Sequence, residues 1–343
     1  MKNQNQTNYF LNYLKGLACM GIVLIHCRFP SVPGAVISAF ARTGIPFFFM
    51  LSGYYTFFAD KETTLVVTGR RIKKTLQLLV AAMICYIGWR FLPKLLSGGI
   101  AEAMEWLSLA IFQSQNIFDF LLFNVTDSIN GVLWYIPAAL YVYLLFGILV
   151  KIFGKRYFVL YLTASILLIG NLVLCELGTV LGFGIHLKWY RNFLLTGYPF
   201  FMLGHYLHNK EKDIQLIKNK NIPLLISVLG TVMIIMESRF VGNALLYTGN
   251  VVFITGLYLY AIQNRNSKKG TLIEQIGSNL YLYIYISQVA VIEVVGKFWE
   301  RIPFFAGDFG LYAKPVLVLG LVILFSAFLH FAQLKNPYKK MKG

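Results

Sequence analysis

The sequence predicts an all-α, polytopic membrane protein with about ten transmembrane helices and both termini in the cytoplasm. Hydrophobic residues make up 57% of the 343 residues and charged residues only 13%, whereas a soluble domain carries about 25% charged residues. Apolar runs of roughly 17–25 residues, the length that crosses the hydrocarbon, recur along the chain. Most of the 31 Lys and Arg lie in alternate segments between these runs, which is the positive-inside pattern.

Ten segments are long and apolar enough to be predicted as spans. They are 12–28, 36–58, 75–92, 132–151, 157–176, 193–208, 222–237, 245–262, 279–297 and 311–333. The sixth is short, and Pro137 is expected to interrupt the fourth. The region 100–122 is partly apolar but contains Glu102, Glu105 and Asp119, so we expect an outer-side or re-entrant helix there instead of a span.

The distribution of the basic residues, which give the chain a net charge of +17, agrees with this topology. The basic residues gather in predicted cytoplasmic segments, where they orient the spans and contact anionic lipids. These segments contain Lys61, Arg70, Arg71, Lys73 and Lys74; Lys151, Lys155 and Arg156; Lys210, Lys212, Lys218 and Lys220; Arg265, Lys268 and Lys269; and Lys335, Lys339, Lys340 and Lys342. No basic face is free of the membrane, so nucleic-acid binding is not expected.

We expect one membrane domain over residues 1–343, with no fused soluble domain. The polar start and the lack of a small-residue cleavage site predict that the first span is retained and no signal peptide is removed. The four cysteines lie in or beside spans without paired spacing, which excludes a disulfide framework. His205 and His208 are three residues apart but have no third ligand in sequence, so no metal site is expected.

The first predicted span carries two ionisable residues, Lys15 and His26. Eleven helical steps of about 100° leave their side chains only about 20° apart in azimuth and about 16 Å apart along the axis. Ionisable groups inside a membrane span are costly, and by default they indicate function. In the predicted topology Lys15 lies near the cytoplasmic end and His26 toward the outer end.

Six short motifs occur in order along the chain. They are Lys15-Gly16 with His26, the stretch Gly44-Ile45-Pro46-Phe47-Phe48 that leads to Ser52-Gly53, Arg70-Arg71-Ile72-Lys73, Leu133-Trp134-Tyr135, Tyr190-Arg191-Asn192-Phe193 that leads to Pro199-Phe200-Phe201-Met202-Leu203-Gly204, and Gly277-Ser278-Asn279-Leu280-Tyr281. In this order, and in a ten-span frame, they resemble the acyltransferase-3 family. Its members are ten-helix membrane enzymes, mostly bacterial, that move acyl groups onto extracytoplasmic sugars.

The chain departs from the family pattern at two positions. Many members have Arg where this chain has Lys15, and Lys lacks the planar fork that binds phosphate or carboxylate in a bidentate way. Many members also carry Tyr-x-x-His-Pro in the ninth span, whereas this chain reads Tyr285-Ile286-Ser287-Gln288-Val289. We expect Gln288 to serve in packing or polar support.

The resemblance implies a multi-pass O-acyltransferase of the plasma membrane, in a bacterium the inner or cytoplasmic membrane. The expected donor is cytoplasmic acyl-CoA, namely acetyl-CoA, and the expected acceptor is a hydroxyl of an extracytoplasmic or lipid-linked saccharide. His26 would be the general base, because the unperturbed histidine pKa of about 6.5 suits proton transfer near neutral pH; the alternative is an interfacial histidine bonded to a carbonyl or headgroup. Lys15 would contact the donor; the alternative is a lysine that snorkels to orient the span.

Two further groups of residues are predicted to bind substrates. The basic group, which suits the phosphates of coenzyme A but also fits a positive-inside anchor, consists of Arg70, Arg71, Lys73 and Lys74. The outer group, which suits a sugar but also fits an interfacial belt of Trp, Tyr and Arg, consists of Trp134, Tyr135, Arg191 and Asn192, with Ser52 added by the family motif.

Two other classes of function remain open from the sequence. A transporter of an amino acid or a lipid-linked sugar would also have buried charge, and Glu293 is the one plausible coupling carboxylate in the predicted spans. A transporter of this kind often shows broken helices at matching positions of two repeats, and no such pattern is evident. A non-catalytic scaffold would leave Lys15 and His26 unexplained.

Overall fold

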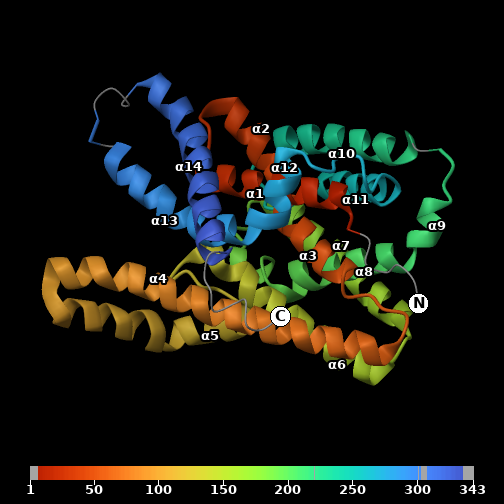
Figure 1. Cartoon of the computed structure of the whole chain (residues 1–343), viewed down its shortest axis with the longest axis horizontal. Helices are drawn as coiled ribbons and strands as arrows, with labels where there is room; N and C mark the ends of the chain where they lie inside the picture. Colours follow the sequence, from red (N-terminus) through yellow and green to blue (C-terminus); the bar gives the residue numbers. More distant parts are fainter. Residues whose placement is uncertain (1–6, 220, 300, 303–306, 335–343) are drawn as a thin grey trace. The chain divides into compact units, whose positions relative to one another are not determined.

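The computed structural model describes residues 7–219, 221–299, 301–302 and 307–334. Within these ranges the chain forms helices and no strand (Figure 1), which confirms the predicted all-α fold class. The chain divides into two compact units. The first unit consists of Met1–Phe47 and Lys212–Gly343, and the second unit of Phe48–Glu211.

In the first unit, helix α1 packs against most of the other helices. Its neighbours are α2, α11, α12, the π-helical turn η4, α13 and α14. Helices α10 and α11 also pack against each other. The elements are α1 Tyr9–His26, α2 Ser31–Ala41, α10 Asn221–Phe240, α11 Thr248–Gln263, α12 Leu272–Gln275, η4 Ile276–Leu280, α13 Tyr281–Trp299 and α14 Asp308–Leu334, and the short α9 Glu211–Gln215 begins at the unit boundary.

Two glycines, Gly16 of α1 and Gly277 of η4, bring α1 into close backbone contact with α12 and η4. A Cβ added at Gly277 would lie 1.9 Å from the Asn12 carbonyl oxygen, and one added at Gly16 would lie 2.3 Å from the Ile273 carbonyl oxygen. Small residues allow helix backbones to approach closely, as is common between membrane helices. This crossing determines which side chains of α1 face η4 and α13.

The second unit is built around the contact of α4 with α6 and the contact of α7 with α8. Gly53 of α3 and Gly204 of α8 allow another close crossing, because a Cβ at either glycine would lie within 2 Å of a carbonyl oxygen on the other helix. The elements are α3 Gly44–Tyr54, which begins in the first unit, α4 Lys61–Phe112, α5 Ser114–Phe123, η1 Gly131–Trp134, α6 Tyr135–Phe153, α7 Tyr157–Val180, η2 Leu187–Trp189, the π-helical turn η3 Phe193–Gly197 and α8 Tyr198–Asn209.

Among the described residues, eight helical segments are long and apolar enough to cross a membrane. They are Tyr9–His26, Ser31–Tyr54, Lys61–Phe112, Gly131–Phe153, Tyr157–Val180, Asn221–Phe240, Leu272–Trp299 and Asp308–Leu334. Each overlaps one predicted span. The other two predictions, 193–208 and 245–262, coincide with η3–α8 and with α11, and α8 and α11 contain 12 and 16 residues. The count of ten and the cytoplasmic termini stay predictions; Lys220 and the C-terminal lysines lie outside the described residues.

Two of the predicted spans differ in detail from the structure. The predicted span 36–58 is two helices, because α2 ends at Ala41 and α3 begins at Gly44. Pro46 has no N–H to donate to the carbonyl four residues earlier, so the helix ladder breaks there. Pro137 does not interrupt the fourth span, because it lies in the first turn of α6, where a backbone N–H has no helical partner anyway.

Helix α4 extends well beyond the predicted span 75–92. It begins at Lys61, with Asp60 as its N-cap, and its only non-helical residue is Gly99, with φ of 75°. Glycine adopts this left-handed conformation without steric cost, and the chain turns back there, so that α5 contacts α4 (Figure 1). The helical character of region 100–122 is confirmed; its outer-side or re-entrant location stays a prediction.

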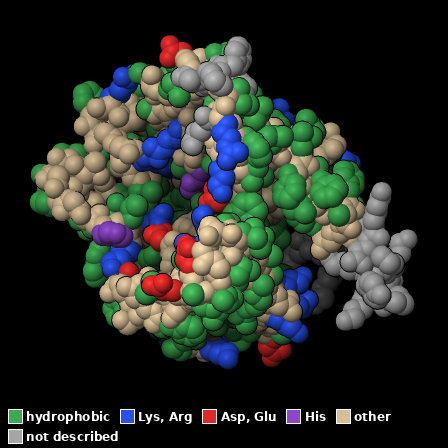
Figure 2. Space-filling model, turned by 90° about the vertical axis from the view of Figure 1, so that its left-hand side faces the viewer, with side chains coloured by type: hydrophobic (Ala, Val, Ile, Leu, Met, Phe, Trp, Pro, Cys, Tyr) green, Lys and Arg blue, Asp and Glu red, His purple; other side chains and the backbone are tan. Residues whose placement is uncertain are grey.

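The outer surfaces of the long helices carry apolar stripes. On α7 the exposed large apolar residues are three or four positions apart, at Phe158, Leu162, Ile166, Ile169, Val173 and Leu177. Figure 2 shows hydrophobic side chains over much of one face, with charged side chains gathered in patches. Exposed apolar area of this extent indicates contact with lipid. The protein is therefore a multi-pass membrane protein.

Candidate active site

Helix α1, which carries the predicted catalytic pair, is anchored at its start by Asn8. The Asn8 side chain accepts a hydrogen bond from the Leu11 N–H at 2.9 Å and thereby caps the helix. Its Nδ2 donates to the Ala261 carbonyl of α11 at 2.8 Å. The helix then runs without a break to His26, so the two predicted side chains share one helical face about 16 Å apart along the axis.

Lys15 faces the helices of its own unit. Its ammonium nitrogen lies 4.2 Å from the ring centroid of Tyr281, at the start of α13, well within cation–π range. The buried Glu274 carboxylate interacts with the same ammonium and accepts a hydrogen bond from Asn12 Nδ2 at 3.1 Å. The close contact of Gly16 with η4 fixes this arrangement. The Lys15 side chain therefore faces neighbouring helices, and its contact with the donor stays a prediction.

His26 is the last residue of α1, and its side chain is exposed. The helix ends there because Cys27 leaves the helical conformation while its N–H still bonds the Val23 carbonyl. An exposed ring at a helix end is accessible to a second molecule. Lys15 is thus partly buried among neighbouring helices, whereas His26 is exposed at the end of α1.

Gln288 is completely buried in α13. Its Nε2 donates to the Tyr285 carbonyl at 3.1 Å, while its Oε1 has no hydrogen-bond partner among the residues that the structure describes. Beside it, the Ser287 and Ser326 hydroxyls are 3.3 Å apart and link α13 to α14. Gln288 follows Tyr281 by two helical turns and therefore lies on the same face of α13.

The predicted phosphate-binding group lies on the first part of α4, and its members differ in role. Arg71 donates to the Tyr55 carbonyl at 2.8 Å, and its guanidinium carbon lies 5.9 Å from the ring centroid of Tyr143. Arg71 is thus held by the C-terminal end of α3, where a cation is favourable. The other three members are exposed, namely Arg70, Lys73 and Lys74.

The predicted acceptor residues in the second unit form two contacting pairs. The Ser52 hydroxyl lies 3.5 Å from the Tyr135 hydroxyl, and Phe49 packs against the Tyr135 ring with centroids 4.8 Å apart. The Arg191 guanidinium carbon lies 5.4 Å from the ring centroid of Trp134. An aromatic face, a hydroxyl pair and a guanidinium are groups that suit a sugar.

Asn192 shapes the backbone beside these pairs. Its carboxamide oxygen accepts hydrogen bonds from the Leu194 and Leu195 N–H groups at 2.9 Å each. Its nitrogen donates to the Lys188 and Trp189 carbonyls at 3.0 and 2.9 Å. These bonds cap the π-helical turn η3, and π-helical turns are frequent at functional sites. The buried Asn192 therefore sets the backbone that carries Arg191.

Two ion pairs lie beside these residues. Lys188 Nζ lies 3.0 Å from Asp119 Oδ1, and Arg191 lies 3.8 Å from Asp127. Burial alone would raise the pKa of Asp119, but hydrogen bonds from Gln115 and Lys188 and the charge of Lys188 outweigh it and lower that pKa. Asp119 is thus a charged anchor between α5 and η2.

Four residues that contact the predicted site residues were not predicted from the sequence as part of the site. They are Glu274, Asp119, Asp127 and Lys188. Asp119 and Asp127 have a weak signal in the sequence, because they are acidic residues in predicted outer segments. Glu274 has none, because its distance of 259 residues from Lys15 conceals their contact. Conversely, Lys15 and His26 belong to the first unit, and all other predicted site residues belong to the second.

Comparison with known proteins agrees with the motifs. The model of the acyltransferase-3 family, described as an acyltransferase domain, matches residues 8–331 and so covers nearly the whole chain. Neither the curated proteins nor the solved structures give a significant match. The matched residues include all of the second unit and most of the first. The chain therefore belongs to the acyltransferase-3 family and is a membrane acyltransferase.

Proposed function

We propose that this protein transfers an acetyl group from cytoplasmic acetyl-CoA to a hydroxyl of an extracytoplasmic or lipid-linked saccharide. The observation that supports the proposal is the exposed position of His26 at the end of α1, in a member of an acyltransferase family. His26 is an exposed titratable base at the end of a continuous helix, and the other end of that helix holds a lysine among polar partners.

In the proposed reaction His26 acts as the general base. The acceptor hydroxyl oxygen attacks the thioester carbonyl, so that a C–O bond forms and the C–S bond breaks. His26 takes the hydroxyl proton, and the departing thiolate takes up a proton and leaves as the thiol of coenzyme A. A base positioned in this way contributes roughly 10²–10⁴-fold to the rate.

The donor is proposed to enter from the side of Lys15. A cation at this position suits the negative charge of a phosphorylated donor, and its setting over Tyr281 keeps it in one orientation. Arg70, Lys73 and Lys74 are exposed and can pair with phosphate, while Arg71 is tied to Tyr55 and holds α4 against α3.

The acceptor is proposed to bind at Trp134, Tyr135, Ser52 and Arg191. Aromatic faces stack on the apolar faces of sugar rings, and the hydroxyls and the guanidinium supply directional hydrogen bonds. Asn192 is proposed to act as a positioning residue, because its hydrogen bonds go to the backbone that precedes and follows Arg191.

The proposal is tested with the purified full-length protein in lipid nanodiscs, radiolabelled acetyl-CoA and a panel of candidate glycans. The wild type is compared with His26→Ala and with His330→Ala, a matched control on α14 that contacts Tyr283. We expect transfer to fall by roughly 10²–10⁴-fold in His26→Ala and to stay at the wild-type level in His330→Ala.

Two outcomes would contradict the proposal in different ways. Undiminished transfer by His26→Ala would exclude His26 as the base. Absence of transfer to every acceptor, together with substrate counterflow in liposomes, would instead favour the transporter of an amino acid or lipid-linked sugar.

A further inference from the structure

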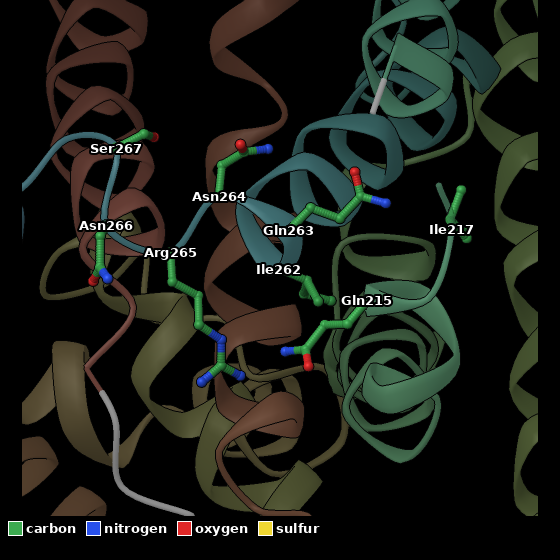
Figure 3. A pocket seen from close by; sticks show the side chains of 8 residues that line it. All are labelled: Gln215, Ile217, Ile262, Gln263, Asn264, Arg265, Asn266 and Ser267. Carbon is green, nitrogen blue, oxygen red and sulfur yellow. The ribbon is translucent and has the colours of Figure 1, made fainter. Parts of the chain in front are cut away.

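A cavity of about 470 Å³ lies in the first unit, at the end of α11. Its walls come from α9 with the residues after it and from residues 262–267. Its volume falls in the range of about 300–1,000 Å³ that is typical of small-molecule sites. Its six polar lining residues are Gln215, Gln263, Asn264, Arg265, Asn266 and Ser267, and no acidic residue lines it (Figure 3).

One hydrogen bond joins the two walls, and a second fixes the end of α11. Gln263 Nε2 donates to the Ile214 carbonyl at 3.1 Å, and Ile214 is itself buried. The Asn264 side chain donates to the Tyr260 carbonyl at 3.0 Å and fixes the end of α11. Hydrogen bonds therefore hold both walls of this open cavity in place, although the walls are far apart in sequence.

The chemistry of the lining suits an anion that also donates hydrogen bonds. In Figure 3 the side chains of Arg265 and Gln215 extend toward the same space beside Ile262. The guanidinium of Arg265 matches phosphate geometry. Gln263 Oε1 is buried and has no hydrogen-bond partner within the described part of the chain, so an amine or amide N–H of a bound molecule would satisfy it.

The charges around the cavity are mainly positive. Lys268 and Lys269 follow Arg265 in the same turn and lie 5.3 and 5.2 Å over the rings of Tyr13 and Tyr9. Lys212 and Lys218 flank the other wall, where Glu211 and Asp213 are the acidic neighbours. Both walls belong to segments that the charge pattern predicts to be cytoplasmic.

The cavity is also connected to α1. The Phe10 N–H donates to the Arg265 carbonyl at 3.1 Å, and Asn8 bonds Ala261 one turn earlier. Lys15 follows Phe10 by five residues on the same helix, about 7.5 Å along the axis. An elongated molecule bound here by its phosphorylated end would lie near the start of the helix that carries Lys15 and His26.

We propose that this cavity binds the phosphorylated nucleotide end of the acyl donor, an inference that rests on the proposed use of acyl-CoA. A lipid headgroup carries phosphate as well. The nucleotide fits better because six of the residues lining the cavity are polar, and because a nucleotide base offers amine hydrogens to Gln263. Arg265 is then a binding residue for the donor, in the unit that contains His26.

The test measures binding of unacylated coenzyme A to the full-length protein in phosphatidylcholine nanodiscs. We expect Arg265→Gln to raise Kd about tenfold or more, as the loss of a charge-assisted hydrogen bond does. Ser267→Asp, a change of an exposed side chain at the rim, is expected to weaken binding as well. Arg239→Gln, an exposed arginine at the end of α10, is the control and is expected to leave Kd unchanged.

The arms of the experiment separate the two sources of phosphate. Unchanged Kd in both Arg265→Gln and Ser267→Asp would overturn the proposal. A second result would also overturn it: phosphatidylglycerol raises the Tm of the wild type, Arg265→Gln loses this effect, and Arg265→Gln still binds coenzyme A. That result would assign the cavity to a lipid headgroup. Because His26→Ala is expected to bind coenzyme A normally, failure of the proposed catalytic base would not be mistaken for failure of this site.

Discussion

The contact between α1 and η4 can be tested by one added methyl group, with Gly277→Ala. The new Cβ would lie 1.9 Å from the Asn12 carbonyl oxygen, whereas ordinary contact begins at 3.4 Å. The two backbones would therefore have to separate by about 1.5 Å. Because the backbone fixes the position of Cβ and the atom it meets is a backbone oxygen, no side-chain rotation can relieve the clash.

Two effects of this separation are expected. Overpacking of this kind costs about 1–3 kcal/mol, so Tm should fall by several degrees. The Lys15 ammonium, now 4.2 Å from the Tyr281 centroid, would move toward the limit of about 6 Å for a cation–π contact. We therefore also expect a higher KM for acyl-CoA.

Thermal unfolding in detergent and transfer kinetics measure these effects. The matched control is Gly296→Ala on α13, where an added Cβ meets no atom within 4 Å. That change should leave Tm unchanged or raise it slightly, since Ala favours helix over Gly by up to about 1 kcal/mol. Equal Tm and KM for the two variants would refute the argument that Gly277 brings the backbones together.

Three further predictions concern single side chains. Lys15→Met should raise the KM for acyl-CoA about tenfold or more, whereas Lys15→Arg should keep it near the wild-type value; equal kinetics would exclude a donor contact. Asp119→Asn should lower Tm at pH 7. Because folding lowers the pKa of Asp119, its carboxylate stabilises the fold fully above the ordinary Asp pKa of about 3.9, and this stabilisation is lost as pH falls through the pKa of the folded state. The difference in Tm between wild type and Asp119→Asn should therefore vanish in acid. A difference that stays constant with pH would contradict the ion pair. Gln288→Leu should raise Tm, because it removes a buried oxygen that has no hydrogen-bond partner among the described residues; a lower Tm would show that this carboxamide supports the fold.

The helices were largely predictable from hydropathy. A span must satisfy its backbone hydrogen bonds internally, so length and apolarity suffice to identify it. The tenth prediction, 311–333, differs from α14 Asp308–Leu334 by only a few residues. Helix α4 was underestimated because hydropathy detects only apolar residues, whereas the helical hydrogen bonds continue into polar sequence from Lys61 onward.

The site was predictable in its residue types but not in its contacts. Lys15 and His26 were identified because charge is rare within a span. The partners of Lys15 were not, because Glu274 and Tyr281 are brought to it by the crossing of α1 with η4. For Asn192, the sequence indicated a polar residue near an outer interface, and the structure shows a carboxamide bonded to four backbone groups.

The sequence by itself determined the membrane class, the helical segments, the family and the position of the ionisable pair on one helix. These follow from local composition, helical period and motif order. The tertiary structure decided that Lys15 faces neighbouring helices, that His26 is exposed, and that Gln215, Ile217 and residues 262–267 line one cavity. Such contacts depend on where backbones approach, as at Gly16 and Gly277, and no periodicity along one segment records which distant segment will pack against it.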